Sequence, residues 1–145
     1  MSDLSSLCAL IVDHEDWLLD RVLKYARELD FTRYASTLRE AWRLSIHELS
    51  RTLVEAIQRD HGPIELSPDD DYQTDPAAAF GVFEAKRHRE RGISLTLFLA
   101  LMKYYRQAYL DLVTERLPQG ADRDAWLLVI NRLYDRMELG VYSEW

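Results

Sequence analysis

The stretch from Ser94 to Leu117, SLTLFLALMKYYRQAYLDLVTERL, decides the fold of this chain. At about 100° per residue of an α-helix, its polar positions fall in one narrow sector, and the rest of the circumference is apolar. A helix that is apolar on most of its circumference is surrounded by other elements of the protein. We therefore expect residues 94–117 to form a buried helix at the centre of an all-α fold.

Arg106 lies in the middle of the apolar sector of that helix. A charge in such a position needs a partner. The structural interpretation is an ion pair with an acidic residue on a neighbouring helix. The functional interpretation is a pocket in which the guanidinium holds the carboxylate or phosphate of a small anionic ligand, framed by Tyr105, Tyr109 and Trp42.

Length and composition limit the class of protein. The chain has 145 residues, which suits one domain, and its 48% hydrophobic content is typical of a folded protein. A net charge of −7 disfavours nucleic acid or an anionic membrane as a partner. The single cysteine, Cys8, cannot form an internal disulfide, and the N-terminus lacks the basic region of a signal peptide. These features predict a cytoplasmic protein.

Four further helices are predicted around the central one. Apolar residues recur at spacings of three and four over residues 3–28, 31–59, 76–91 and 122–145. Thr37 and Glu40 have the spacing of a capping box, so the second helix can break near residue 36. Residues 60–75 form an acidic loop with six acidic and no basic side chains. The sequence therefore predicts a five-helix bundle around a buried fourth helix.

Helix ends are marked around the central stretch. Asp75 and Pro76 have the residue types of an N-cap and a first helical position. Gly92 suits the position after a helix C-terminus, and Ser94 suits the next N-cap. The basic run from Lys86 to Arg91 is explained better by a solvated helix C-terminus than by a phosphate site.

The last helix carries a second, weaker apolar seam opposite its main stripe. We expect a homodimer interface there, although solvation of scattered apolar residues is the competing interpretation. Nothing in the sequence ends this helix at Trp145, so we expect it to lead into an output domain. The seam consists of Leu128, Leu139 and Tyr142, with Arg132 and Asp135 between them.

The motifs of catalysis and of cofactor binding are not found. No glutamate stands three residues before any of the four histidines, and no HExxH, GxSxG or P-loop pattern occurs. Helical projection places His47 and His88 away from the apolar faces, and His14 at the edge of one. Haem binding is therefore disfavoured. We expect no enzyme activity, no metal and no cofactor.

Residues 89–106 resemble a known family. The segment RERGISL at 89–95, followed by FLALMKYYR at 98–106, is similar to the N-terminal domains of RsbR-type stressosome proteins and of some bacterial sensor histidine kinases. The final segment, DRMELGVYSEW, resembles the helix that leads out of such a domain. The resemblance implies a globin-like fold without haem, used for signal input and dimerisation.

These observations predict a non-catalytic regulatory input and dimerisation domain of a bacterial signal-transduction protein, with a sensor histidine kinase as the class of the whole protein. Its partners would be a second copy, an output domain or signalling protein, and a small anionic ligand. The alternatives are a globin-type carrier of haem or another small ligand, and a stand-alone helical adaptor that binds only protein.

Overall fold

The computed structural model describes residues 4–33, 38–60 and 65–145. Within these residues the regular structure is entirely helical, with no strand. The elements are α1 (Leu4–Asp13), α2 (Glu15–Glu28), the 3₁₀ turn η1 (Phe31–Arg33), α3 (Arg39–Asp60), the 3₁₀ turn η2 (Pro76–Ala78), α4 (Ala79–Glu90), α5 (Leu95–Arg116) and α6 (Ala121–Glu144). The predicted all-α class is confirmed, with six α-helices in the described residues instead of five.

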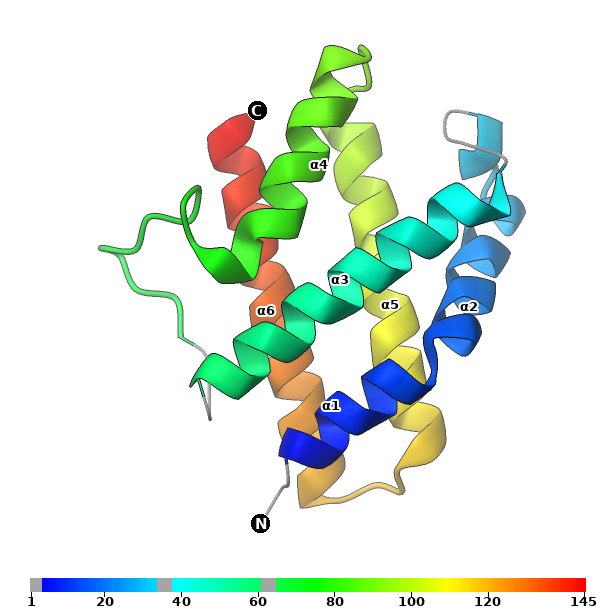
Figure 1. The fold of residues 1–145 in the computed structure, drawn as a ribbon, viewed down its shortest axis with the longest axis vertical. Helices are drawn as coiled ribbons and strands as arrows, with labels where there is room; N and C mark the ends of the chain where they lie inside the picture. The colour runs from blue at the N-terminus through cyan, green and yellow to red at the C-terminus, as the bar shows by residue number, and fades with distance from the viewer. Residues whose placement is uncertain (1–3, 34–37, 61–64) are drawn as a thin grey trace.

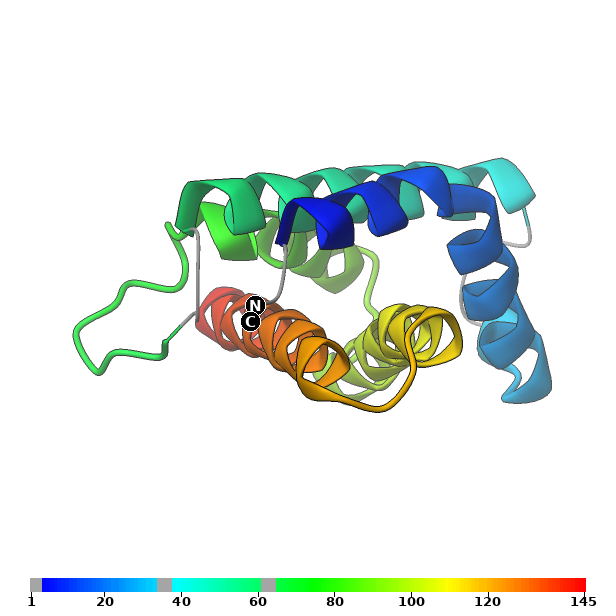
Figure 2. The same cartoon turned by 90° about the horizontal axis from the view of Figure 1, so that it is seen from below.

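The helices cross in two layers. Figures 1 and 2 show α1 and α3 side by side on one side of the molecule, and α5 and α6 on the other. α2 closes one edge between the layers and packs on α3 and α5, whereas α4 packs on α3, α5 and α6. This arrangement places α4 next to both layers.

α5 is the helix predicted at 94–117, and its ends differ from that prediction by one residue each. Ser94 caps it, since the backbone N–H of Leu97 donates to the Ser94 hydroxyl at 3.2 Å. Seven of its side chains are buried, but the last helix, α6, is buried as extensively through its contacts with α3, α4, α5 and η2. The centre of the fold is therefore the α5–α6 pair.

The first predicted helix, 3–28, is wrong as a single element. The backbone leaves helical geometry at His14 (φ −122°, ψ 31°), so α1 and α2 point in different directions (Figure 2). The apolar stripe conceals the break, because Ile11 and Leu18 are seven residues apart and therefore remain in phase. The bend lets α1 pack on α3 while α2 reaches both α3 and α5.

The predicted helix over 31–59 is also divided, into η1 and α3. η1 ends at Arg33 and α3 begins at Arg39. The predicted break near residue 36 and Thr37 of the expected capping box lie outside the described residues. The third predicted helix, 76–91, begins as the 3₁₀ turn η2 before continuing as α4. Asp75 caps it as expected, since its carboxylate accepts the Ala77 N–H at 3.0 Å.

The described part of the acidic loop is attached to α6. Arg136 pairs with Asp75 at 2.5 Å and with Asp70 at 3.0 Å, and its guanidinium lies 5.1 Å from the centre of the Tyr72 ring. The Arg136 side chain is mostly buried. One cation on α6 thus neutralises two of the carboxylates that repel one another in this acidic segment.

α4 and α6 meet closely because each has a glycine at the contact. A Cβ atom on Gly140 would lie 2.9 Å from the Tyr72 carbonyl oxygen and from Val82 Cγ2, and one on Gly81 would lie 2.6 Å from Met137 Cγ. Any larger side chain would therefore force these helices apart. Across the described residues, no helix has the length and apolarity needed to cross a membrane.

Candidate functional site

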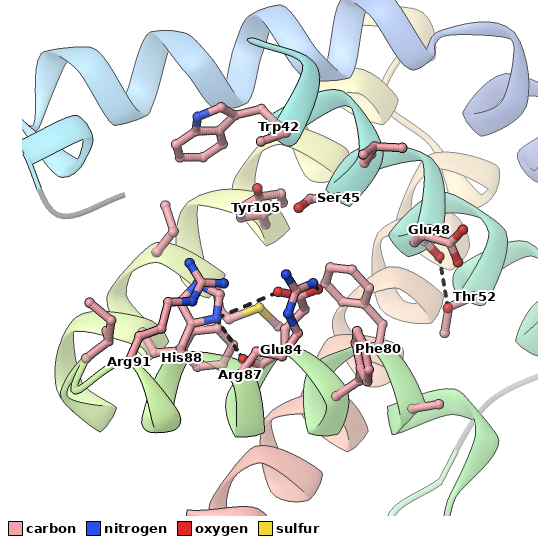
Figure 3. Close-up of a pocket in the computed structure, with 18 of the residues that line it drawn as sticks. Trp42, Ser45, Glu48, Thr52, Phe80, Glu84, Arg87, His88, Arg91 and Tyr105 are labelled. Atoms are coloured by element: carbon pink, nitrogen blue, oxygen red, sulfur yellow. Dashed lines mark hydrogen bonds and ion pairs between the residues drawn. The ribbon is translucent and has the colours of Figure 1, made fainter. Parts of the chain in front are cut away.

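A cleft of about 830 Å³ lies where α3, α4 and α5 meet (Figure 3). Each helix contributes one face, because the lining positions recur every three or four residues. From α3 these are Ala41, Trp42, Leu44, Ser45, Glu48, Arg51 and Thr52; from α4, Ala79, Phe80, Phe83, Glu84, Arg87 and His88; and from Arg91 onward, Arg91, Ile93, Phe98, Leu101, Met102 and Tyr105. The volume is that of a small-molecule site.

The deep wall of the cleft is apolar and aromatic. Phe98, Met102 and Tyr105 are buried on α5, and the Trp42 ring stacks on Tyr105 with centroids 6.1 Å apart. Burial raises the pKa of Tyr105, and the Ser45 hydroxyl beside it offsets part of that increase. Leu44 and Phe83 border the mouth and are 61% and 60% exposed. The cleft therefore offers apolar surface that the protein itself leaves uncovered.

Charged residues of α3 and α4 surround the mouth, and most of them are paired. Arg51 contacts Glu48 at 2.6 Å, and Arg87 contacts Glu84 at 3.5 Å. His88 Nδ1 donates to the Glu84 carbonyl oxygen at 2.7 Å, while its ring lies 4.8 Å from Phe98. The basic run of 86–91, interpreted from sequence as a solvated helix end, supplies three of the lining residues, Arg87, His88 and Arg91.

The structure divides the ligand-binding set predicted from sequence. Of that set, Trp42 and Tyr105 line the cleft, whereas Arg106 and Tyr109 do not. Arg106 lies on another face of α5, about 100° around the helix from Tyr105. Tyr109 lies about one helical turn beyond Tyr105 on nearly the same face, where its hydroxyl contacts Ser50 of α3. The candidate site therefore contains the two predicted aromatic residues, and Arg87 and Arg91 supply positive charge there instead of Arg106.

Arg106 lies in an ion network between α5 and α6. Its guanidinium pairs with Glu138 at 2.9 Å and with Asp135 at 3.1 Å, and Lys103 also reaches Glu138 at 2.8 Å. The side chains of Arg106 and Glu138 are 15% and 9% exposed. These contacts agree with the structural interpretation of Arg106, an ion pair with an acid on a neighbouring helix.

Tyr109 is fully buried against α3 and α6. Its hydroxyl lies 2.7 Å from that of Ser50, and its ring lies 6.0 Å from that of Tyr134. Burial raises the pKa values of both tyrosines. The Tyr134 hydroxyl has no hydrogen-bond partner among the described residues. These residues form a closed core between α3, α5 and α6, about one helical turn beyond Tyr105.

The expected dimer seam lies on α6. Leu128 and Tyr142 are exposed, and Leu139 is half-buried. An exposed Leu and an exposed Tyr on one helix are compatible with both interpretations: a dimer interface, or isolated apolar side chains in contact with solvent.

The histidines and the cysteine lie as follows. His14 is half-buried with its Nδ1 2.7 Å from the Leu10 carbonyl oxygen, and His47 is exposed beside Glu15. His88 was placed away from Phe80 and Phe83 by helical projection, but all three line the cleft. Cys8 is buried, and burial raises the pKa of its thiol. In the described ranges, no group of three or more His, Cys, Asp or Glu side chains could hold a metal ion.

Comparisons with protein-family models, with curated proteins and with solved structures find no match to this chain. The resemblance of residues 89–106 to stressosome sensor domains rests on its sequence motif.

Sequence reasoning missed the α3 wall of the cleft and the role of α4. A signal was present on α3, where Ala41, Ser45, Glu48 and Thr52 follow helical spacing beside the apolar stripe. Small and polar residues at the edge of a stripe leave room between two helices. On α4, the same residues that suit a helix C-terminus also suit a cleft mouth, so the sequence could not distinguish the two.

Proposed function

We propose that this chain is a cytoplasmic, non-catalytic regulatory input domain, in which occupancy of the cleft between α3, α4 and α5 changes the packing of the C-terminal end of α6. The observation that carries the proposal is the position of Phe98. Its ring lies 4.8 Å from that of His88 in the cleft and 5.7 Å from that of Trp145, next to the last residue of α6. A ligand that displaces the Phe98 ring would therefore change the packing of the Trp145 ring.

A second contact joins the same two places. Arg89 of α4 pairs with the carboxylate of Glu144 at 2.9 Å and also donates to its carbonyl oxygen. Because α4 forms one wall of the cleft, a ligand that shifts α4 would pull on the end of α6 through this pair. Two independent contacts, one aromatic and one ionic, thus connect the cleft to the same helix end.

The sequence resemblance supports a bacterial signal-transduction protein as the setting, of the RsbR type or a sensor histidine kinase, with a globin-like crossing of the helices. The crossed layers of Figures 1 and 2 agree with that arrangement without being specific to it. α6 would pass the change to an output domain or to a partner signalling protein.

Dimerisation through Leu128, Leu139 and Tyr142 belongs to the same proposal. Exposed apolar side chains on a helix that also receives the signal would let a second copy respond to the cleft. Sedimentation equilibrium of the chain is expected to show a dimer that Leu128→Glu converts to a monomer. A monomer at high protein concentration in the unchanged chain would contradict the dimer.

Fluorine NMR of fluorotryptophan-labelled protein tests the coupling, since the chain has four tryptophans, Trp17, Trp42, Trp126 and Trp145. Ser45→Phe places a ring in the cleft beside Tyr105, in place of a ligand, and is expected to shift the resonances of both Trp42 and Trp145. His47→Phe, on the exposed face of α3, is the control and should leave Trp145 unchanged. A Ser45→Phe protein in which Trp42 shifts and Trp145 does not would contradict the proposal.

A haem or small-ligand carrier is the second candidate, favoured by one observation. His88 lines the cleft, and because its Nδ1 donates to a backbone carbonyl, its Nε2 carries the lone pair that a haem iron would require. His14 makes the same local bond on α1, so the geometry is also that of an ordinary helical histidine. Added hemin that gives a Soret band in the wild type, but none in His88→Phe, would support the carrier.

A further inference from the structure

We infer that the cleft between α3, α4 and α5 binds an aromatic organic molecule carrying one negative charge, with Arg91 as its counter-ion. This inference rests on the proposed function for the role of the cleft as a ligand site. It adds the chemical class of the ligand and the residue that selects it.

The charge balance of the cleft sets the charge of the ligand. Three arginines and two glutamates line it, and four of these five residues form the pairs Arg51–Glu48 and Arg87–Glu84. Arg91 is the residue left over, since it makes no ion pair with any residue that the structure describes. With His88 neutral, the lining carries one uncompensated positive charge, in a chain whose net charge is −7.

Arg91 is not needed to end α4. The backbone N–H groups of Arg91, Gly92 and Ile93 already bond the final carbonyl oxygens of the helix, with Gly92 N to Arg89 O at 3.0 Å and Ile93 N to His88 O at 3.0 Å. Gly92 has φ +80°, as a Schellman cap requires. The guanidinium is therefore available, and Figure 3 shows it on the cleft side of α4, facing the wall that holds Trp42 and Tyr105.

The lining favours an aromatic body for the ligand. Three of the four phenylalanines in the chain, Phe80, Phe83 and Phe98, line this one cleft, together with Trp42 and Tyr105. Rings prefer other rings in offset or edge-to-face contact. Met102 adds a thioether at the deep wall, and sulfur also packs favourably on rings. A planar ring can reach these walls while its acid group stays at the mouth with Arg91.

Calorimetric titration with β-naphthoate, β-naphthylmethanol and decanoate tests each part of the inference. The naphthoate is expected to bind at least about tenfold more tightly than the neutral alcohol, as loss of a charged hydrogen bond implies. It should also bind more tightly than decanoate. Equal affinity for the alcohol would overturn the charge assignment, and equal or tighter binding of decanoate would overturn the aromatic one.

Variants locate the binding. Arg91→Gln is expected to weaken naphthoate about tenfold and leave the alcohol unchanged. Lys86→Gln removes one positive charge from the same helix outside the cleft and should change neither affinity by more than about twofold. Ser45→Phe should abolish binding of both ligands. An equal loss in Lys86→Gln and Arg91→Gln, or full binding in Ser45→Phe, would overturn the inference.

The two proposals fail in different ways. If naphthoate affinity depends on Arg91 but Ser45→Phe does not shift the Trp145 resonance, the proposed ligand class stands and the regulatory function is contradicted. If Ser45→Phe shifts the Trp145 resonance but naphthoate and the neutral alcohol bind equally well, the regulatory function stands and the proposed ligand class is contradicted.

Discussion

The two sides of the α4–α5 pair differ in how completely the protein fills them. Toward α6, glycines bring the backbones together and the charges of Arg106 and Glu138 meet inside the contact. Toward α3, the same two helices leave a cleft of about 830 Å³, with Arg91 at its mouth. Arg91 makes no ion pair with any residue that the structure describes. A fold of this size can close one such contact fully and still leave the other open, so we assign stability to the first and ligand binding to the second.

The buried tyrosines give the largest expected effect on stability. Burial raises the pKa values of Tyr105, Tyr109 and Tyr134, so the unfolded chain releases these protons near pH 10 while the folded protein retains them. Their contribution is complete below about pH 10 and is lost as the pH rises above it, by up to about 1.4 kcal/mol per pH unit for each tyrosine.

Alkaline unfolding followed by circular dichroism checks this expectation. Tyr105→Phe, on the cleft side, should reduce the pH dependence by about one proton, and so should Tyr109→Phe on the closed side. If the tyrosinate absorbance of all eight tyrosines rose with one midpoint near pH 10 while the protein kept its helical spectrum, these hydroxyls would not be buried.

Arg106→Met is expected to destabilise the protein by about 2–4 kcal/mol, because Glu138 and Asp135 lose a partner inside the α5–α6 contact. The value lies below that of a fully buried pair because Lys103 still contacts Glu138. Urea unfolding measures it. Lys103→Met is the matched control; its side chain is 58% exposed, so we expect less than about 1 kcal/mol. Equal stability of Arg106→Met and the wild type would contradict the structural role.

Gly140→Ala should cost about 1–3 kcal/mol through overpacking, offset by up to about 1 kcal/mol of helix propensity. The added methyl meets the Tyr72 carbonyl oxygen at 2.9 Å, and a backbone atom cannot easily move away. Ser143→Ala, on the exposed surface of the same helix, is the control and should change stability little. A stabilised Gly140→Ala protein would mean that α4 and α6 are farther apart.

The smallest expected effects on stability come from removing the hydroxyl groups of two neighbouring tyrosines, Tyr109 and Tyr134. Tyr109→Phe leaves the buried Ser50 hydroxyl without its partner and should cost about 1–2 kcal/mol. Tyr134→Phe removes a buried hydroxyl that has no hydrogen-bond partner in the described structure, so it should be neutral or stabilise by up to about 1 kcal/mol. Denaturation midpoints compare the two variants. The opposite order would place the paired hydroxyl on Tyr134.

The sequence predicts most of the helices but less of the site. The start of α5 follows from Gly92 and Ser94, and its extent follows from the continuous apolar sector; both signals are local. The bend at His14 does not follow from local signals, because it depends on α1 and α2 packing against different neighbours. Local periodicity carries no information about such a choice.

The same limit applies to the cleft. A need for a partner could be predicted for Arg106 from its place on α5, but which residue meets it, or whether a ligand does, depends on the register between α5 and α6. The cleft itself arises from three helices at once, and each of its faces is unremarkable alone. Gly81 and Gly140 give a second example. The need for a residue without a side chain at these positions is evident only once α4 and α6 are placed side by side.

Hydrogen-exchange mass spectrometry with and without β-naphthoate tests the contrast between the two sides most directly. Bound ligand is expected to slow exchange in residues 41–52 of α3 and in residues 79–93, which comprise α4 and the turn after it. Residues 126–137 of α6, in the closed contact with α5, should be unchanged. Protection confined to residues 126–137, or no protection anywhere, would contradict the assignment of ligand binding to the open side.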